Sequence, residues 1–260
     1  MGSFFLNLIQ ALFAAFWSAF WISAALVASI FSSELPFVFG RKGFGPGLIW
    51  GARAKVEVHG VPPLDPQKAY VFVMNHQSMF DVPLALAVIP LNIRFILKKS
   101  LKYVPFIGWY AWRTKMVFVD RSNPDSAYQS IEQAVQRLRD GVSILAFPEG
   151  TRRSGPLGPF KRGPFVLAQA AGVEVVPIAA EGAGRILPPG GFKVRGGPVR
   201  VRFGAPMATH PYGNSSEEID RLRRDVRDVM ARMHREIGGD GLPDLASVDL
   251  PVTSSSGSEP

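Results

Sequence analysis

Residues 70–88, YVFVMNHQSMFDVPLALAV, decide the fold because they join two elements of different kinds. Residues 70–74 form a short apolar run, which is typical of a strand that is buried on both faces. Residues 80–88 predict a helix, in which Pro83 is tolerated because it stands in the first turn. A buried strand that leads through a short polar loop into a helix is the repeating unit of α/β sheets.

The same alternation continues along the chain. Further strands are expected at 55–59, 93–97, 116–119, 142–147 and 173–180, and further helices at 124–140 and 163–171. Residues 193–203 predict a hairpin or a bent strand. Ser215 and Glu218 have the spacing of a capping box, which starts a last surface helix. We therefore predict an α/β domain at 53–238, with a mixed sheet flanked by helices.

Residues 1–33 contain no charged side chain and are rich in Phe, Trp, Leu and Ile. About 20 apolar residues suffice to cross a bilayer as a helix. A cleaved signal peptide is disfavoured because no Lys or Arg precedes the apolar run, and a buried helix is the other alternative. Scattered polar and aromatic side chains also permit a helix that lies in the membrane interface. We predict a membrane-anchoring helical segment and connector at 1–52, in which residues 34–51 are a connector rich in Gly and Pro.

The composition narrows the classes of partner. The chain has 260 residues, no cysteine and a formal net charge of +8. Disulfides, thiolate catalysis and cysteine metal sites are therefore excluded. A basic excess suits nucleic acid, anionic lipid or phosphorylated substrates, and the apolar N-terminal segment favours lipid. Residues 239–260 are rich in Gly, Pro, Ser and Asp and predict a disordered tail.

His76 and Asp81 are candidates for a base and the group that orients it. On one regular helix their side chains would point about 140° apart. They can meet if His76 lies in the loop after the 70–74 strand and Asp81 in the first turn of the next helix. Asp81 could then accept a hydrogen bond from one imidazole nitrogen, which fits the other to take a proton from a hydroxyl. The alternative is structural, because Ser78 and Asp81 also have capping-box spacing.

A second polar turn, FPEGTR at 147–152, follows another buried strand. Gly150 permits unusual backbone dihedrals, and Arg152 offers a planar fork that matches phosphate oxygens. Glu149 could pair with a nearby arginine or contact a substrate hydroxyl, and a solvated basic turn is the alternative. A third, basic and aromatic cluster fits a membrane surface with phosphate contacts better than nucleic acid. Its cations are Lys98, Lys99, Lys102, Arg113, Lys115 and Arg121.

Four segments, taken in order, resemble the sequence blocks of the glycerolipid acyltransferase family, specifically its 1-acyl-sn-glycerol-3-phosphate acyltransferases. They are residues 75–81 (a His-x4-Asp block), 98–121, 147–154 and 176–178, and Arg153 is an extra residue in the third block. The resemblance covers about residues 55–205. It implies transfer of an acyl chain from acyl-CoA or acyl carrier protein to the 2-hydroxyl of lysophosphatidate, which gives phosphatidic acid for phospholipid biosynthesis.

The resemblance also implies roles for single residues. His76 would be the general base oriented by Asp81, and the hydroxyl would attack the thioester directly. The phosphate would be held by Lys98, Arg121 and Arg152, and the acceptor site would be shaped by Glu149, Gly150 and Thr151. Loop amides near Asn75 and His76 are candidate donors to the oxyanion.

The expected partners are membrane lipid, lysophosphatidate and the acyl donor, with no metal, no cofactor and no nucleic acid. The expected place is the cytoplasmic face of a bacterial inner membrane. Members of this family can carry a two-helix motif held in one leaflet, but no Pro or Gly breaks residues 3–33, so a single long helix is equally open. The alternatives are an acyltransferase for another lysophospholipid or lipid acceptor, and a non-catalytic module that binds anionic lipid.

Overall fold

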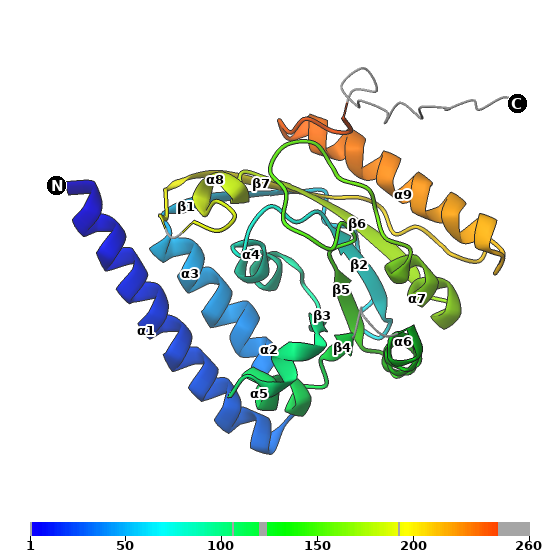
Figure 1. Cartoon of the computed structure of the whole chain (residues 1–260), viewed down its shortest axis with the longest axis horizontal. Helices are drawn as coiled ribbons and strands as arrows, with labels where there is room; N and C mark the ends of the chain where they lie inside the picture. Colours follow the sequence, from blue (N-terminus) through cyan, green and yellow to red (C-terminus); the bar gives the residue numbers. More distant parts are fainter. Residues whose placement is uncertain (1, 106, 120–123, 192, 244–260) are drawn as a thin grey trace, which may run out of the picture.

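The computed structural model describes residues 2–105, 107–119, 124–191 and 193–243. Within these residues one sheet has the strand order β1-β7-β6-β2-β5-β3-β4 (Figure 1). The strands are β1 Ala54–His59, β2 Tyr70–Met74, β3 Ile93–Lys98, β4 Val117–Val119, β5 Ser143–Ala146, β6 Glu174–Glu181 and β7 Gly197–Phe203. Neighbouring strands are parallel except β6 and β7, which are antiparallel. The predicted mixed sheet is confirmed.

Helices cover both faces of the sheet, and β2 shows why. Its five residues are all buried. Phe72 and Met74 belong to one apolar core and Val71 and Val73 to the other, because successive side chains of a strand point to opposite faces. The first core packs on α4 Asp81–Val88 and α5 Ile107–Arg113, and the second on α6 Pro124–Arg139, α7 Gly163–Ala171 and α9 Ser216–Glu236.

Most predicted elements are present, but some differ and others were missed. The capping box is confirmed, because Ser215 accepts a hydrogen bond from the backbone N–H of Glu218. The hairpin or bent strand predicted at 193–203 is wrong, since β7 is one strand that starts at Gly197. Its preceding residues pair elsewhere: the N–H of Arg195 donates to the carbonyl of Ile186. The sequence also missed α5 and two short elements, the 3-10 helix η2 Lys99–Tyr103 and the helix α8 Ala183–Ile186.

The N-terminal segment is a helical hairpin. Helix α1 runs unbroken over Gly2–Phe31. The connector rich in Gly and Pro that was predicted at 34–51 is helical, because helix α2 Leu35–Phe39, the π-helical turn η1 Gly40–Phe44 and helix α3 Gly45–Gly51 follow one another there. The two prolines stand in the first turns of α2 and α3, where a missing N–H costs nothing. This second helical segment lies along α1 (Figure 1).

Glycines hold the two arms of the hairpin together by leaving room for aromatic rings. They recur at every fourth residue, and so do the rings of α1: Gly43 faces Trp21, Gly47 faces Trp17 and Gly51 faces Phe13. A Cβ atom at Gly47 would lie 2.1 Å from the Trp17 ring, a distance that no real contact allows. These glycines, which the local sequence suggests would break a helix, therefore allow the two helical arms to pack closely.

Replacing Gly47 with Ala is expected to destabilise the hairpin. The added methyl group overlaps the Trp17 ring, and overpacking of this kind costs about 1–3 kcal/mol. Thermal unfolding in detergent, followed by tryptophan fluorescence, measures the loss. Gly163→Ala is the matched control, because a Cβ there meets no atom within 4 Å. Equal melting temperatures for the two variants would show that the close packing does not matter.

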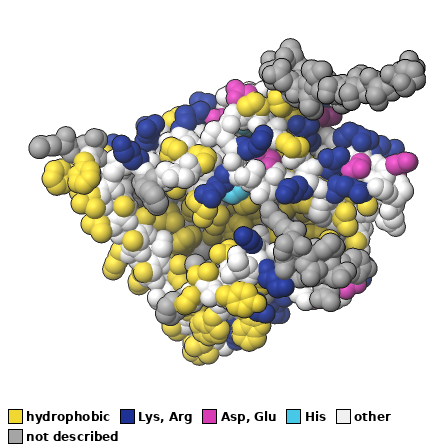
Figure 2. Space-filling model, viewed as in Figure 1, with side chains coloured by type: hydrophobic (Ala, Val, Ile, Leu, Met, Phe, Trp, Pro, Cys, Tyr) yellow, Lys and Arg dark blue, Asp and Glu magenta, His cyan; other side chains and the backbone are white. Residues whose placement is uncertain are grey.

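The outer face of the hairpin is apolar. Within α1, the 28 residues Phe4–Phe31 have a mean hydropathy of 1.9 and are long and apolar enough to cross a membrane. Its exposed side chains include Phe16 and Ile30, and Figure 2 shows apolar side chains along this edge. The helix indicates that the protein associates with a membrane. The predicted division between 1–52 and 53–238 stays a prediction, and most of the predicted tail at 239–260 lies outside the described residues.

Candidate active site

The polar motifs meet at the carboxyl ends of β2, β3 and β5, where ligands bind in open α/β sheets. The loop after β2 carries His76, the loop after β5 carries Glu149, and Lys98 ends β3. The two loops touch directly, because the N–H of Arg153 donates to the carbonyl of His76 over 2.7 Å. Two motifs that are far apart in the sequence are thus one site.

His76 and Asp81 are arranged as the sequence predicted. His76 lies in the loop, Asp81 is the first residue of α4, and His76 Nδ1 is 2.7 Å from Asp81 Oδ2. The same oxygen accepts the backbone N–H groups of Gln77 and Ser78, each over 2.7 Å. Asp81 therefore contacts the imidazole and also holds the loop before α4, but it does not cap the helix, whose N-cap residue Phe80 has no side-chain hydrogen bond. Its catalytic role stays a prediction.

Asp81 is fully buried, and burial raises the pKa of its carboxyl group. The hydrogen bonds from His76, Ser78 and Gln77 act against this rise because they favour the carboxylate. The other oxygen, Oδ1, has no hydrogen-bond partner among the described residues. The hydrogen bonds that Asp81 accepts from described residues thus all go to Oδ2, the oxygen that contacts His76.

The imidazole of His76 is fixed by stacking as well as by Asp81. Its ring lies on Phe147, with the ring centroids 4.0 Å apart and the planes 17° from parallel. The side chain of His76 is 15% exposed. Because Nδ1 is occupied by Asp81, Nε2 is the nitrogen left for a substrate. The sequence did not predict the contact with Phe147, although this residue is the first of the FPEGTR turn.

Glu149 is buried beneath the two loops. It accepts hydrogen bonds from the backbone N–H groups of His76 and Gly158. Burial raises its pKa to about 7, the charge of Arg153 opposes the rise and the charge of Asp81 adds to it. Glu149 thus holds the backbone of His76, and its predicted part in shaping the acceptor site stays a prediction.

The loop amides near His76 are used for structure. The N–H of His76 donates to Glu149, and those of Gln77 and Ser78 donate to Asp81. The amide of His76 was among the candidate oxyanion donors, and this bond occupies it, while the identity of the donors stays a prediction. The side chain of Asn75 bonds the backbone N–H and carbonyl of Ala180 over 2.7 and 2.9 Å, which extends the pairing of β2 with β6.

The other predicted site residues that the structure describes belong to the loop after β5 or line the cavity of His76. Gly150 has a φ of +70°, the left-handed conformation that favours glycine, as the turn predicts. Thr151 and Arg152 follow it on the exposed part of the loop. Lys98 is exposed and lines the same cavity as His76. Arg121 lies outside the described residues.

That cavity, of about 450 Å³, runs from His76 and Lys98 between the sheet domain and the hairpin. Its walls are almost entirely apolar and come from α1, α2, α4, β3 and α5: they include Trp21, Ile22, Phe37, Leu86, Leu97, Tyr110 and Met116. Figure 2 shows a hollow with apolar walls and with Lys and Arg side chains at its rim. The sequence did not predict this cavity, because its walls come from segments that are far apart in the chain.

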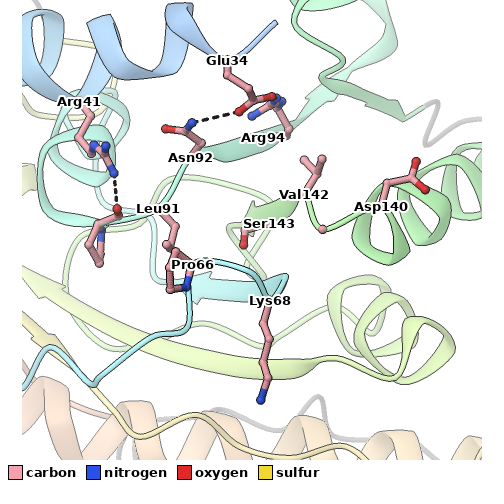
Figure 3. A pocket seen from close by; sticks show the side chains of 12 residues that line it. Glu34, Arg41, Pro66, Lys68, Leu91, Asn92, Arg94, Asp140, Val142 and Ser143 are labelled. Atoms are coloured by element: carbon pink, nitrogen blue, oxygen red, sulfur yellow. Dashed lines mark hydrogen bonds and ion pairs between the residues drawn. The ribbon is translucent and has the colours of Figure 1, made fainter.

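A second cavity, of about 460 Å³, lies at the opposite ends of the strands (Figure 3). Its largest buried side chain is Arg94, whose Nη2 is 2.5 Å from Glu34 and whose guanidinium lies 3.6 Å from the Phe37 ring centroid. Asn92 also donates to Glu34. These contacts fasten the hairpin to the start of β3, which ends at Lys98.

The pKa of Glu149 makes stability depend on pH. A carboxyl group with a pKa raised from 4.5 to about 7 binds its proton more tightly in the folded state. Its contribution to the free energy of unfolding is full below the unfolded pKa and is lost as pH rises through about 7. Urea unfolding between about pH 5.5 and about pH 8 is expected to show this loss, and Glu149→Gln to abolish it. Glu217→Gln, which removes an exposed carboxylate, is the control.

A histidine held by a buried carboxylate, at the mouth of an apolar cavity in an α/β sheet, is an arrangement that suits proton transfer beside an apolar ligand. The acyltransferase family model matches residues 55–181. Together with the relatives and the solved structure described next, this match shows the acyltransferase family and confirms the resemblance of the four sequence blocks to the glycerolipid acyltransferases.

Relatives and a solved structure agree with this membership. The chain is 35% identical over 163 residues to the chloroplastic 1-acyl-sn-glycerol-3-phosphate acyltransferase BAT2 of Brassica napus, covering 62% of this chain and 46% of that protein. It is 33% identical over 189 residues to the human alpha form, covering 72% and 66%. The crystal structure of PlsC, a 1-acyl-sn-glycerophosphate acyltransferase from Thermotoga maritima, matches with a TM-score of 0.77 at 26% identity, covering 90% and 97%. The matches span 46% to 64% of the first three curated relatives.

Proposed function

We propose that the protein transfers an acyl chain from an acyl thioester to the 2-hydroxyl of 1-acyl-glycerol-3-phosphate, and so makes phosphatidic acid for phospholipid biosynthesis. The observation that carries the proposal is the His76–Asp81 pair at the mouth of an apolar cavity that also exposes Lys98. Curated relatives that carry the name of this activity support the choice of acceptor.

In the proposed reaction Nε2 of His76 takes the proton of the 2-hydroxyl while that oxygen attacks the thioester carbonyl. The carbon–oxygen bond forms, the carbon–sulfur bond breaks, and the thiolate that leaves recovers the proton from the imidazolium. Asp81 stabilises the imidazolium because its Oδ2 lies 2.7 Å from Nδ1. The proposal needs neither a covalent acyl-enzyme nor a metal or cofactor.

The acceptor phosphate is assigned to three cations, Lys98, Arg121 and Arg152. Lys98 shares the cavity of His76, and Arg152 belongs to the loop that bonds the backbone of His76. A planar guanidinium binds phosphate oxygens in pairs, which suits Arg152 to this role. Glu149, Gly150 and Thr151 shape the acceptor site in this proposal, Glu149 from beneath the loop and the other two through its turn.

The apolar cavity suits an acyl chain. Each buried methylene contributes about 0.8 kcal/mol, so an alkyl chain gains most from walls that lack polar groups. Trp21 and Ile22 of the hairpin form part of the wall. A chain drawn from the bilayer therefore reaches His76 along a surface that continues the membrane anchor.

The proposed place of work is the cytoplasmic face of a bacterial inner membrane, with acyl-CoA or acyl carrier protein as donor. Exposed aromatic side chains of α3 and α5, Trp50, Trp109 and Trp112, support an interfacial position beside α1. Tryptophan prefers the level of the lipid head groups. Flotation with anionic liposomes tests the membrane contact.

The decisive experiment supplies purified protein with lysophosphatidate and either acyl-CoA or acyl carrier protein, and follows release of free thiol. We expect turnover that depends on both substrates, and a higher KM for lysophosphatidate in Arg152→Ala. Preference for another lysophospholipid would replace the acceptor. Binding to liposomes without turnover of any thioester would favour the non-catalytic module and overturn the proposal.

A further inference from the structure

A second histidine–carboxylate pair lies behind the site, in the core of the protein. His234 of α9 has its Nε2 3.1 Å from Oε2 of Glu181, at the end of β6. The same carboxylate oxygen accepts the side-chain amide of Gln77 over 2.6 Å. His234 is fully buried and the other two are nearly so, so that none of them is placed to touch a substrate.

The donors and acceptors of this network fit in one way only. The N–H of Gly241 donates to Nδ1 of His234 over 3.2 Å, so that Nε2 carries the proton and donates to Glu181. The carbonyl oxygen of Gln77 accepts the N–H groups of Gly182 and Gly184, and this turns its amide nitrogen toward Glu181. Every group has one role, which makes the network rigid.

Glu181 is the charged centre of the network. Burial acts to raise the pKa of its carboxyl group, but the hydrogen bonds from His234 and Gln77 and the charge of Arg185 outweigh it, so that the pKa lies below its usual value. Arg185 Nη1 bonds the other carboxylate oxygen over 2.6 Å. Glu181 therefore stays a carboxylate that accepts from three side chains.

The network continues to His76 through Gln77. The backbone N–H of Gln77 donates to Oδ2 of Asp81, the oxygen that holds His76 Nδ1. Gln77 is thus bound on both sides, by its side chain to Glu181 and by its backbone to Asp81. Three hydrogen bonds lead from His234 to the carboxylate that orients the imidazole.

Helix α9 and the residues that follow it also hold the second loop of the site. The carbonyl of Gly241 accepts the N–H of Leu157, and Arg227 donates to the carbonyl of Gly158. The N–H of Gly158 in turn donates to Glu149, which bonds the backbone of His76. Both loops of the site are therefore held by contacts with α9 and the residues that follow it.

We propose that His234 is a positioning residue of the acyl transfer, which holds His76 through Glu181, Gln77 and Asp81. The inference rests on the proposed function for its kinetic consequence, but its structural consequence for His76 does not depend on any substrate. Loss of the Nε2 donor removes one hydrogen bond from Glu181, and the side chain of Gln77 can then shift together with Glu181. Because the backbone N–H of Gln77 bonds Asp81, this shift moves Oδ2 of Asp81 out of line with Nδ1 of His76.

The test compares His234→Leu, which keeps the bulk and loses the donor, with His234→Gln, which keeps an N–H near the same place. Supporting partners of a catalytic histidine are worth about 10- to 100-fold in activity. We expect kcat to fall at least about tenfold in His234→Leu with both KM values within about twofold, and His234→Gln to recover most of the loss. The exposed His210→Leu is the control.

Proton NMR of ¹⁵N-histidine-labelled protein gives the readout that needs no substrate. The downfield Nδ1–H signal of His76, identified by its loss in His76→Ala, is expected to move upfield or exchange away in His234→Leu and to return in His234→Gln. Gln77→Met, which cuts the same path, is expected to do the same, and to add nothing to His234→Leu. It also carries the test if His234→Leu does not fold.

An unchanged His76 signal and an unchanged kcat in folded His234→Leu would overturn the inference. A loss of kcat that His234→Gln does not recover would also overturn it, because it would indicate a packing role. If the wild-type protein turns over no acceptor while the His76 signal still responds to His234→Leu, the proposed function fails and the positioning of His76 by His234 stands.

Discussion

Alanine in place of His76 is expected to lower kcat about 10³-fold. A positioned general base contributes about 10² to 10⁴ in rate, and His76 lines the cavity with its Nδ1 held by a buried carboxylate. The 2-hydroxyl would have to lose its proton to water, and the thiolate would leave without an acid beside it. Thiol release under saturating substrates measures the effect.

The KM values separate this effect from a loss of binding. Lys98, Arg152 and the apolar walls are untouched in His76→Ala, so we expect both KM values to stay within about threefold. His59→Ala removes an exposed histidine at the edge of the sheet and is the matched control. Full activity of His76→Ala would refute the assignment of the base.

The sequence correctly predicted those parts of the structure that contacts between nearby residues determine. The strand β2, the loop and α4 follow directly from residues 70–88, and this one segment brings His76 to Asp81. Gly150 was also predictable, because a sharp turn after a buried strand requires a residue that tolerates positive φ. The interaction partners here are at most a few residues apart in the chain.

The sequence failed where distant segments decide. Gly47 predicts a break in a helix, and only its spacing of four residues from Gly43 and Gly51, matched by the aromatic residues of α1, could have indicated close packing. Glu149 looks like a surface acid among cations, yet the loop of His76 buries it. His234 is one histidine near the end of an amphipathic helix, and nothing in its neighbourhood predicts Glu181, which lies 53 residues away.

The variants Asp81→Asn and Asp81→Ala are expected to lower kcat alike but to lower the free energy of unfolding by different amounts. In Asp81→Asn the amide oxygen can take the place of Oδ2, where it accepts from His76, Gln77 and Ser78. The NH₂ group of the new side chain then takes the place of Oδ1, which has no partner among the described residues. The shape is kept and the charge is lost, so the imidazolium is no longer stabilised, and we expect kcat to fall about 10²- to 10³-fold.

Asp81→Ala removes the acceptor as well as the charge. The backbone N–H groups of Gln77 and Ser78 would then be buried without a partner, and each such group costs about 1–3 kcal/mol. Asp81→Asn escapes this cost and also the penalty that burial imposes on a carboxylate, which the raised pKa of Asp81 expresses. Urea unfolding should therefore rank Asp81→Ala well below Asp81→Asn. Equal stability of the two variants would show that Asp81 does not hold the loop, and full kcat in Asp81→Asn would show that its charge is not required.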